Sequence, residues 1–186
     1  RALVTALLAA RGSTPLVLDA DALNVLAPWA AGRALANAVL TPHPGEAARL
    51  LASTVAEVQA ARETCALALA SRSGAVVVLK GASTVVAEGE RVFVNTSGNA
   101  GLATAGSGDV LAGLLGALLA QGMTPFDAAR LAVHVHGKAG DRVAARLSRR
   151  LLAGRGGSAA VRTRDNRPGR ARRPSYRRVG WLAPRR

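Results

Sequence analysis

Short apolar runs alternate with longer segments of helical periodicity along the body of the chain. Three of these runs, residues 15–19, 38–41 and 75–79, are rich in Leu and Val and end beside charged or turn-forming residues. Runs of this length and composition are typical of the buried strands of a parallel sheet. Two more strands are expected at residues 84–87 and 91–94, where a turn that contains Gly joins them into a hairpin at the edge of the sheet. The pattern predicts an α/β fold.

The segments between the strands predict helices. The first is expected to end at Arg11 and Gly12 and to precede a strand rather than to form part of a signal peptide, because no A-x-A-like cleavage site follows it. A Ser or Thr ahead of Glu57 resembles a capping box at the start of another helix. Further helices are expected at residues 21–26, 29–36, 45–51, 55–72, 110–121 and 125–145.

The composition suits one domain with a core of small aliphatic side chains. The chain has 186 residues, of which 49% are hydrophobic and 3% are aromatic. No apolar run reaches the roughly 18 to 20 residues that a membrane span needs. Cys65 is the single cysteine, so an internal disulfide is excluded, and a reducing cytoplasm is the expected location.

The net charge of +14 is concentrated at one end of the chain. Residues 1–146 contain 12 Lys and Arg against 10 Asp and Glu, whereas residues 147–186 contain 13 against 1. The density of Arg, Gly and Pro in residues 147–186 predicts a disordered basic tail. This tail is interpreted either as an RNA- or membrane-binding arm or, preferably, as the product of a shifted reading frame. For the body, whose charge is ordinary, neither nucleic acid nor a membrane is an expected partner.

A glycine-rich stretch, residues 95–113, follows the strand at residues 91–94 and reads N-T-S-G-N-A-G-L-A-T-A-G-S-G-D-V-L-A-G. An apolar helix is expected from Val110 onward. Glycines in such a loop supply positive φ angles and let the backbone approach a ligand closely. The glycines in question are Gly98, Gly101, Gly106 and Gly108.

The end of this stretch predicts an anion site. The amides of Gly106, Ser107 and Gly108 are expected to point outward where the helix begins, and the helix dipole favours a phosphate there. Asp109 would repel such a ligand unless it has a task of its own, and the task expected of it is to accept a proton. The alternative, that Asp109 or Ser107 only caps the helix, stays open.

Two further positions lie at the carboxyl ends of predicted strands. His43 follows the strand at residues 38–41 and is fixed between two prolines, where it is placed to donate to a substrate amide or a phosphate. Lys80 follows the strand at residues 75–79 and opens the sequence K-G-A-S-T, whose cation, glycine and hydroxyls suit the phosphates or ribose of a nucleotide. A surface histidine and a solvated lysine are the alternatives.

The sequence D-A-D-A-L-N follows the first predicted strand. Asp21 and Asn24 are candidates to face the same cleft, because parallel sheets place their ligands at this edge. A helix cap at Asp21 and a solvated Asp19 are equally acceptable interpretations. The pair His134 and His136 is not expected to bind a metal, because residues two apart on a helix face different sides.

Four motifs in order resemble the ADP- or ATP-dependent NAD(P)H-hydrate dehydratases of the ribokinase-like superfamily. The resemblance extends from about residue 16 to residue 146 and rests on L-D-A-D-A-L-N, T-P-H-P-G-E, V-V-L-K-G-A-S-T and N-A-G-L-A-T-A-G-S-G-D-V-L-A-G. It implies a three-layer α/β sandwich with a mostly parallel sheet. By the same resemblance, residues 1–146 form a partial domain that lacks the N-terminal portion, so activity of this fragment alone is doubtful.

The resemblance also implies an activity, which is nucleotide-dependent dehydration of hydrated NADH and NADPH, with ADP giving AMP in the bacterial type. It implies that His43 and Asp109 contact the hydrate and that Asp109 removes the proton from its hydroxyl. Mg²⁺, a homo-oligomer in the intact enzyme, and an epimerase as a partner or fused domain are implied as well. The residues implied to hold the nucleotide are Lys80, Gly81, Ala82, Ser83, Thr84 and Gly108.

Two alternatives come from other classes. G-S-G-D is shared with ribokinase-like kinases of vitamin-precursor alcohols of the hydroxyethylthiazole or hydroxymethylpyrimidine type, although T-P-H-P-G-E argues against them. The other alternative is a non-catalytic fragment whose basic tail binds nucleic acid.

Overall fold

The core of the protein is a five-stranded sheet, and the computed structural model describes residues 2–153. The strands follow one another across the sheet in sequence order, with β1, β2 and β3 parallel, β4 antiparallel to β3, and β5 antiparallel to β4. All strands except β4 therefore run in one direction, which confirms the predicted mostly parallel sheet. The strands are β1 (Leu16–Leu18), β2 (Ala38–Leu40), β3 (Val76–Leu79), β4 (Val85–Glu88) and β5 (Arg91–Val94).

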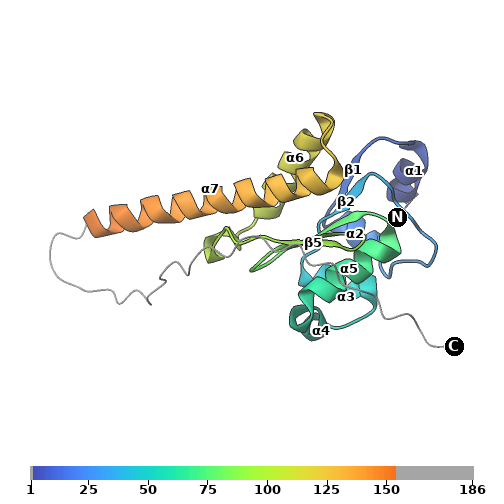
Figure 1. The fold of residues 1–186 in the computed structure, drawn as a ribbon, viewed down its shortest axis with the longest axis horizontal. Helices are drawn as coiled ribbons and strands as arrows, with labels where there is room; N and C mark the ends of the chain where they lie inside the picture. The colour runs from blue at the N-terminus through green and yellow to red at the C-terminus, as the bar shows by residue number, and fades with distance from the viewer. Residues whose placement is uncertain (1, 154–186) are drawn as a thin grey trace.

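Helices cover both faces of the sheet, which gives the predicted three layers (Figure 1). One face packs on α2 (Asp21–Leu26), α3 (Pro44–Leu51), α4 (Val55–Ala60) and α5 (Arg62–Ser73), and the other on α6 (Ser107–Ala120) and α7 (Pro125–Ala153). Alternate residues of β3 divide between the two cores: Val77 and Leu79 join the first, whereas Val76 and Val78 join the second. This alternation explains why every residue of β3 is both apolar and buried.

The N-terminal helix α1 (Ala2–Ala10) contributes little to the core. Val4 and Leu8 pack against the α2–α5 side, but Leu3 and Leu7 are 72% and 57% exposed. No helix among residues 2–153 has both the length and the apolar character needed to cross a membrane.

The segment at residues 29–36 is not a helix, contrary to the prediction. Its backbone donors are used by other elements: the Trp29 N–H donates to the Leu50 carbonyl at 3.0 Å, and the Leu35 N–H donates to the Ser73 carbonyl at 2.6 Å. Gly32, at φ +75°, interrupts the segment further. Its apolar residues instead pack against the α2–α5 side, where Trp29 is buried.

The predicted helix at residues 55–72 is two helices, because Ala61 between them has a φ of −135°. The expected capping box is present at the start of the first, where the Thr54 hydroxyl accepts from the Glu57 N–H and the Glu57 carboxylate accepts from the Thr54 N–H. The break lets Arg62 open α5 with its guanidinium turned toward the sheet, where it donates to the Leu79 and Lys80 carbonyl oxygens.

The last two helices are longer than predicted. α6 begins at Ser107 rather than at Val110, so the G-S-G-D residues form its cap and first turn. α7 continues past residue 145 to Ala153, across the boundary at residue 146 between the predicted domain and its tail. Residues 154–186 of that tail lie outside the described part of the chain, and the division into domain and tail stays a prediction.

Candidate nucleotide-binding cleft

A cleft of about 760 Å³ lies at the carboxyl ends of the parallel strands, within the roughly 300–1,000 Å³ typical of ligand pockets. Segments far apart in the sequence meet there: His43 after β2, residues 80–84 after β3, and residues 95–100 after β5. The cleft wall also includes Ser107 and Gly108 at the start of α6, and His136 from α7. The cleft therefore brings together most of the residues that the sequence singled out.

Lys80 lies between two carboxylates at one end of this cleft. Its ammonium donates to Asp19 Oδ1 at 2.6 Å and lies 3.9 Å from Glu46 Oε2. Asp19 is thus not the solvated residue of the open alternative, because its side chain is 15% exposed. Sequence reasoning missed Glu46, which is only 4% exposed. The only sequence signal was the position of Glu46 at the end of T-P-H-P-G-E, close to a strand end, because its burial is not readable from the sequence.

The N-terminus of α6 approaches this ion pair. A Cβ added to Gly108 would lie 3.5 Å from the Lys80 ammonium and 3.7 Å from Asp19 Oδ2, so only a very small residue leaves that space open. The Ser107 N–H is already used, since it donates to the Thr104 carbonyl at 3.2 Å. Among the described residues the Gly108 N–H has no acceptor, which leaves it available to an anion in the first turn.

Two of the four loop glycines have the backbone conformation that the sequence predicts. Gly98 and Gly106 have φ angles of +101° and +81°, whereas Gly101 and Gly108 do not have positive φ. Gly106 caps α6, so the alternative that Asp109 or Ser107 acts as the N-cap is not what the fold adopts. Gly108 matters for the space that it leaves rather than for its dihedral angle.

Asp109 and Gly106 do not line the cleft. Asp109 is exposed in the first turn of α6, and its carboxylate has no hydrogen-bond or ion-pair partner among the described residues. It directly follows Gly108, so it stands at the edge of the site rather than inside the core. Its proposed role as a base stays a prediction.

His43 has a structural task that the sequence did not reveal. Its Nδ1 accepts from the N–H groups of Gly45 and Glu46 at 3.0 and 3.3 Å, so the imidazole is the N-cap of α3. The Glu46 carboxylate completes this capping box by accepting from the His43 N–H at 2.7 Å. With Nδ1 acting as an acceptor, a neutral ring carries its proton on Nε2. Half of the side chain is exposed, and Nε2 lies 3.4 Å from Glu46 Oε1.

His136 is a cleft residue that sequence reasoning set aside. Its Nε2 lies 3.3 Å from the Ser107 hydroxyl, so the ring links α7 to the first residue of α6. Burial lowers the pKa of His136 below its usual value, and a smaller contribution from the neighbouring Ser107 raises it. The imidazole is therefore neutral near pH 7. His134 and His136 face different sides of α7, as predicted, because only His136 lines the cleft. Among the described residues there is no group of three or more metal-ligating side chains.

The K-G-A-S-T turn is held from behind by α5. Arg62 Nη2 donates to the Leu79 and Lys80 carbonyl oxygens at 2.9 and 3.2 Å, and burial lowers the pKa of Arg62. Within the turn the Thr84 hydroxyl donates to the Gly81 carbonyl at 2.9 Å. Gly81 has a φ of +134°, a conformation open to glycine and strained for other residues. The turn is thus held both by α5 and by a bond within itself.

The remaining sequence candidates lie elsewhere. Asp21 is the exposed first residue of α2, which is capped by Ala20, and Asn24 accepts a hydrogen bond from Arg49. Neither residue lines the cleft.

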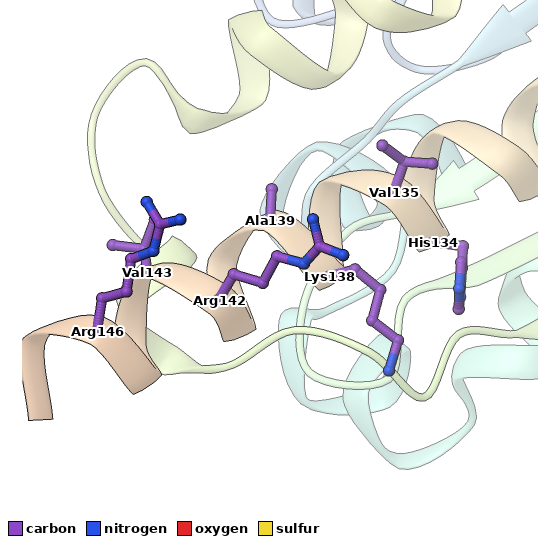
Figure 2. A pocket seen from close by; sticks show the side chains of 7 residues that line it. All are labelled: His134, Val135, Lys138, Ala139, Arg142, Val143 and Arg146. Atoms are coloured by element: carbon purple, nitrogen blue, oxygen red, sulfur yellow. The ribbon is translucent and has the colours of Figure 1, made fainter. Parts of the chain in front are cut away.

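A second hollow lies on the outer side of α7 (Figure 2). The described residues that line it all come from that one helix, with Val135, Ala139 and Val143 beside the cations Lys138, Arg142 and Arg146. None of these residues lines the cleft, and none is a candidate for binding or catalysis.

The fold and the cleft place the protein in the ribokinase-like class. A crystal structure of a ribokinase-like superfamily protein from Enterococcus faecalis matches it with a TM-score of 0.63 at 29% identity, over 77% of this chain and 50% of that one. The crystal structure of an ADP/ATP-dependent NAD(P)H-hydrate dehydratase from Bacillus subtilis, co-crystallised with ATP and Mg²⁺, matches with a TM-score of 0.62 at 36% identity, over 73% and 47% of the two chains.

Sequence comparison narrows the class to one family. A family model described as NAD(P)H-hydrate dehydratase matches residues 2–155, and the chain belongs to this family. It is 54% identical over 147 residues to the ADP-dependent (S)-NAD(P)H-hydrate dehydratase of Neisseria meningitidis serogroup B. That match covers 75% of this chain and 50% of the relative, so the chain spans half the length of that protein. The predicted family is thus confirmed over the alternative of a vitamin-precursor kinase.

Proposed function

We propose that the protein takes part in nucleotide-dependent dehydration of the (6S)-hydrates of NADH and NADPH, with ADP or ATP as co-substrate. The close approach of the α6 N-terminus to Lys80 at the wall of the cleft is the observation that carries the proposal. A free amide in a first helical turn and a lysine beside it are suited to the terminal phosphates of a nucleotide. Family membership supports the hydrate as the second substrate.

In this reaction the transferred phosphoryl group needs charge stabilisation and alignment more than covalent help. The Gly108 N–H and the Lys80 ammonium provide positive charge, while residues 80–84 hold the nucleotide. Asp109, next to Gly108, accepts the proton from the hydrate hydroxyl, whose oxygen then attacks the terminal phosphorus. The bond from that phosphorus to the leaving nucleotide breaks, with AMP released when the nucleotide is ADP. The phosphorylated hydrate then loses phosphate from one ring carbon and a proton from the neighbouring carbon, and the double bond that forms between them gives the dihydronicotinamide.

His43 has a place in the same scheme. Its Nδ1 is committed to the α3 amides, so only Nε2 is able to donate, and the ring is half exposed at the cleft. We propose that Nε2 donates to the hydrate substrate. The ring then contributes to binding without taking or giving up a proton.

The residues around Lys80 fit a magnesium ion associated with the nucleotide. Mg²⁺ is usually bound through one or two carboxylates together with substrate phosphates rather than by an all-protein cage. Asp19 is the carboxylate that would hold the ion together with the nucleotide phosphates, because Glu46 is almost fully buried and already accepts from the His43 N–H. When bound there it supplies Lewis-acid stabilisation of the phosphate charge.

Three further assignments belong to the same proposal. We place the reaction in the cytoplasm, where the single cysteine stays reduced. The active form is proposed to be a homo-oligomer, and an epimerase that interconverts the two hydrate epimers is the proposed partner.

The test supplies the purified protein with hydrated NADH, Mg²⁺, and ADP or ATP in turn. Recovery of absorbance at the dihydronicotinamide band in a nucleotide-dependent manner is the expected result. Absence of recovery with both nucleotides, in a sample that binds ADP by calorimetry, would contradict the proposed dehydration while leaving nucleotide binding intact.

A further inference from the structure

One wall of the cleft is the loop of residues 95–100, and side-chain hydrogen bonds join this loop to α7. Residues 95–100 leave β5 and line the cleft. Asp141 of α7 holds this loop with both carboxylate oxygens: Oδ2 accepts from the Gly98 N–H and Oδ1 from the Asn99 Nδ2, each at 3.1 Å. These bonds lower the pKa of Asp141, with the Gly98 bond contributing most.

Two glycines of α7 let the loop lie directly on the helix. A Cβ added to Gly137 would come within 2.3 Å of the Ser97 Oγ, and one added to Gly140 within 2.7 Å of the Leu102 Cγ. The Asn95 side chain, which is almost fully buried, adds a bond from its Nδ2 to the Val133 carbonyl at 3.2 Å. The loop and the segment H-G-K-A-G-D of α7 therefore fit together as one unit.

We propose that Asp141 is a positioning residue for nucleotide binding, which acts by holding the loop of residues 95–100 in place as a wall of the cleft. The identity of the ligand rests on the proposed function. Asp141 does not itself line the cleft, and both of its oxygens are used by the loop. Among the described side chains of α7, the last buried hydrophobic one is Val133, so Asp141 holds the loop without supporting the hydrophobic core.

The experiment compares Asp141→Ala, Asp141→Asn and the control Arg142→Ala, whose side chain lines the separate hollow on the outer side of α7. Loss of a hydrogen-bonded carboxylate is expected to raise the dissociation constant for ADP about tenfold in Asp141→Ala. Turnover at saturating nucleotide should stay within about twofold, because the reacting groups are untouched. Asp141→Asn keeps one acceptor oxygen and should recover part of the affinity, and Arg142→Ala should bind as the parent does.

A second measurement needs no ligand, and so it separates this proposal from the proposed function. Amide hydrogen exchange of Gly98 and Asn99 should be about tenfold faster in Asp141→Ala, with exchange in the β3 core unchanged. If the parent protein binds neither ADP nor ATP, the proposed function fails, and the exchange result still decides whether Asp141 holds the loop. Unchanged exchange at Gly98, or an unchanged ADP dissociation constant in a protein that binds ADP, would overturn the positioning role.

Discussion

The Lys80 ammonium donates to Asp19 Oδ1 at 2.6 Å, which ties the turn after β3 to the turn after β1. Both side chains are mostly buried, at 21% and 15% exposure, so their interaction is only weakly screened by solvent. With Glu46 at 3.9 Å, the lysine offsets part of the negative charge of two carboxylates that would otherwise repel a phosphate at the start of α6. Lys80 therefore has two tasks, to attract the nucleotide and to offset the acids around it.

This pairing predicts strong coupling between Lys80 and Asp19 in nucleotide binding. Lys80→Ala should weaken ADP binding by more than about tenfold when no divalent metal is present, because it leaves the carboxylates unpaired beside the phosphate site. Asp19→Asn in the same background should restore part of the affinity, with a coupling free energy of roughly 1–3 kcal/mol in calorimetric titrations. Arg142→Ala, which removes an exposed cation from the outer hollow, is the control. Additive effects of the two substitutions would contradict the pairing.

His136 predicts a specific dependence of stability on pH. Its pKa is lowered in the folded protein, chiefly by burial, so the unfolded chain takes up the proton more readily than the folded one. The stabilisation by the neutral ring is therefore complete above the ordinary histidine pKa and is lost as the pH falls through the folded value. Between about pH 7.5 and pH 5 the parent should lose more free energy of unfolding than His136→Gln does.

Urea denaturation of both proteins at the two pH values measures this difference. His134→Gln is the matched control, since it removes an exposed histidine two residues away on the same helix. If its pH dependence matches that of His136→Gln, burial of the His136 ring is not the cause.

The layers and strands were predictable because they depend on local patterns. The apolar runs at residues 75–79 and 38–41 are short, β-branched and bounded by turn residues, and they fold as the strands β3 and β2. The helix predicted at residues 29–36 does not form, because this segment depends on contacts that are distant in the sequence. Trp29 and Leu35 have backbone donors that bond to α3 and to the end of α5, and no local pattern contains such long-range partners.

The types of residue at the site were predictable from the sequence, but the hydrogen bonds and contacts between them were not. Lys80 and Gly108 stand out from glycine-rich turns after strands, and the fold brings them together. The role of His43 as the cap of α3 and the contact of His136 with Ser107 depend on tertiary geometry. Glu46 looks in the sequence like an ordinary first-turn acid, and only its burial distinguishes it.

Replacement of Arg62 is expected to destabilise the protein at the turn of residues 80–84. Arg62→Met removes the bonds to the Leu79 and Lys80 carbonyls and should lower the free energy of unfolding by roughly 1–3 kcal/mol in urea titrations. Arg72→Met, at an exposed position of the same helix, should change it by less than about 0.5 kcal/mol. ADP affinity should fall only in the first variant, because the turn that begins at Lys80 loses its support. If the two variants have equal free energies of unfolding, the Arg62 hydrogen bonds make no net contribution to stability.

The central claim is that a nucleotide phosphate rests at the start of α6 while Asp109 beside it takes the hydroxyl proton. The most direct test measures ADP affinity and turnover of hydrated NADH in Asp109→Asn. Because a general base contributes about 10²- to 10⁴-fold, turnover should fall by at least about 100-fold while the ADP dissociation constant stays within about twofold. Turnover within about tenfold of the parent would show that Asp109 is not the base.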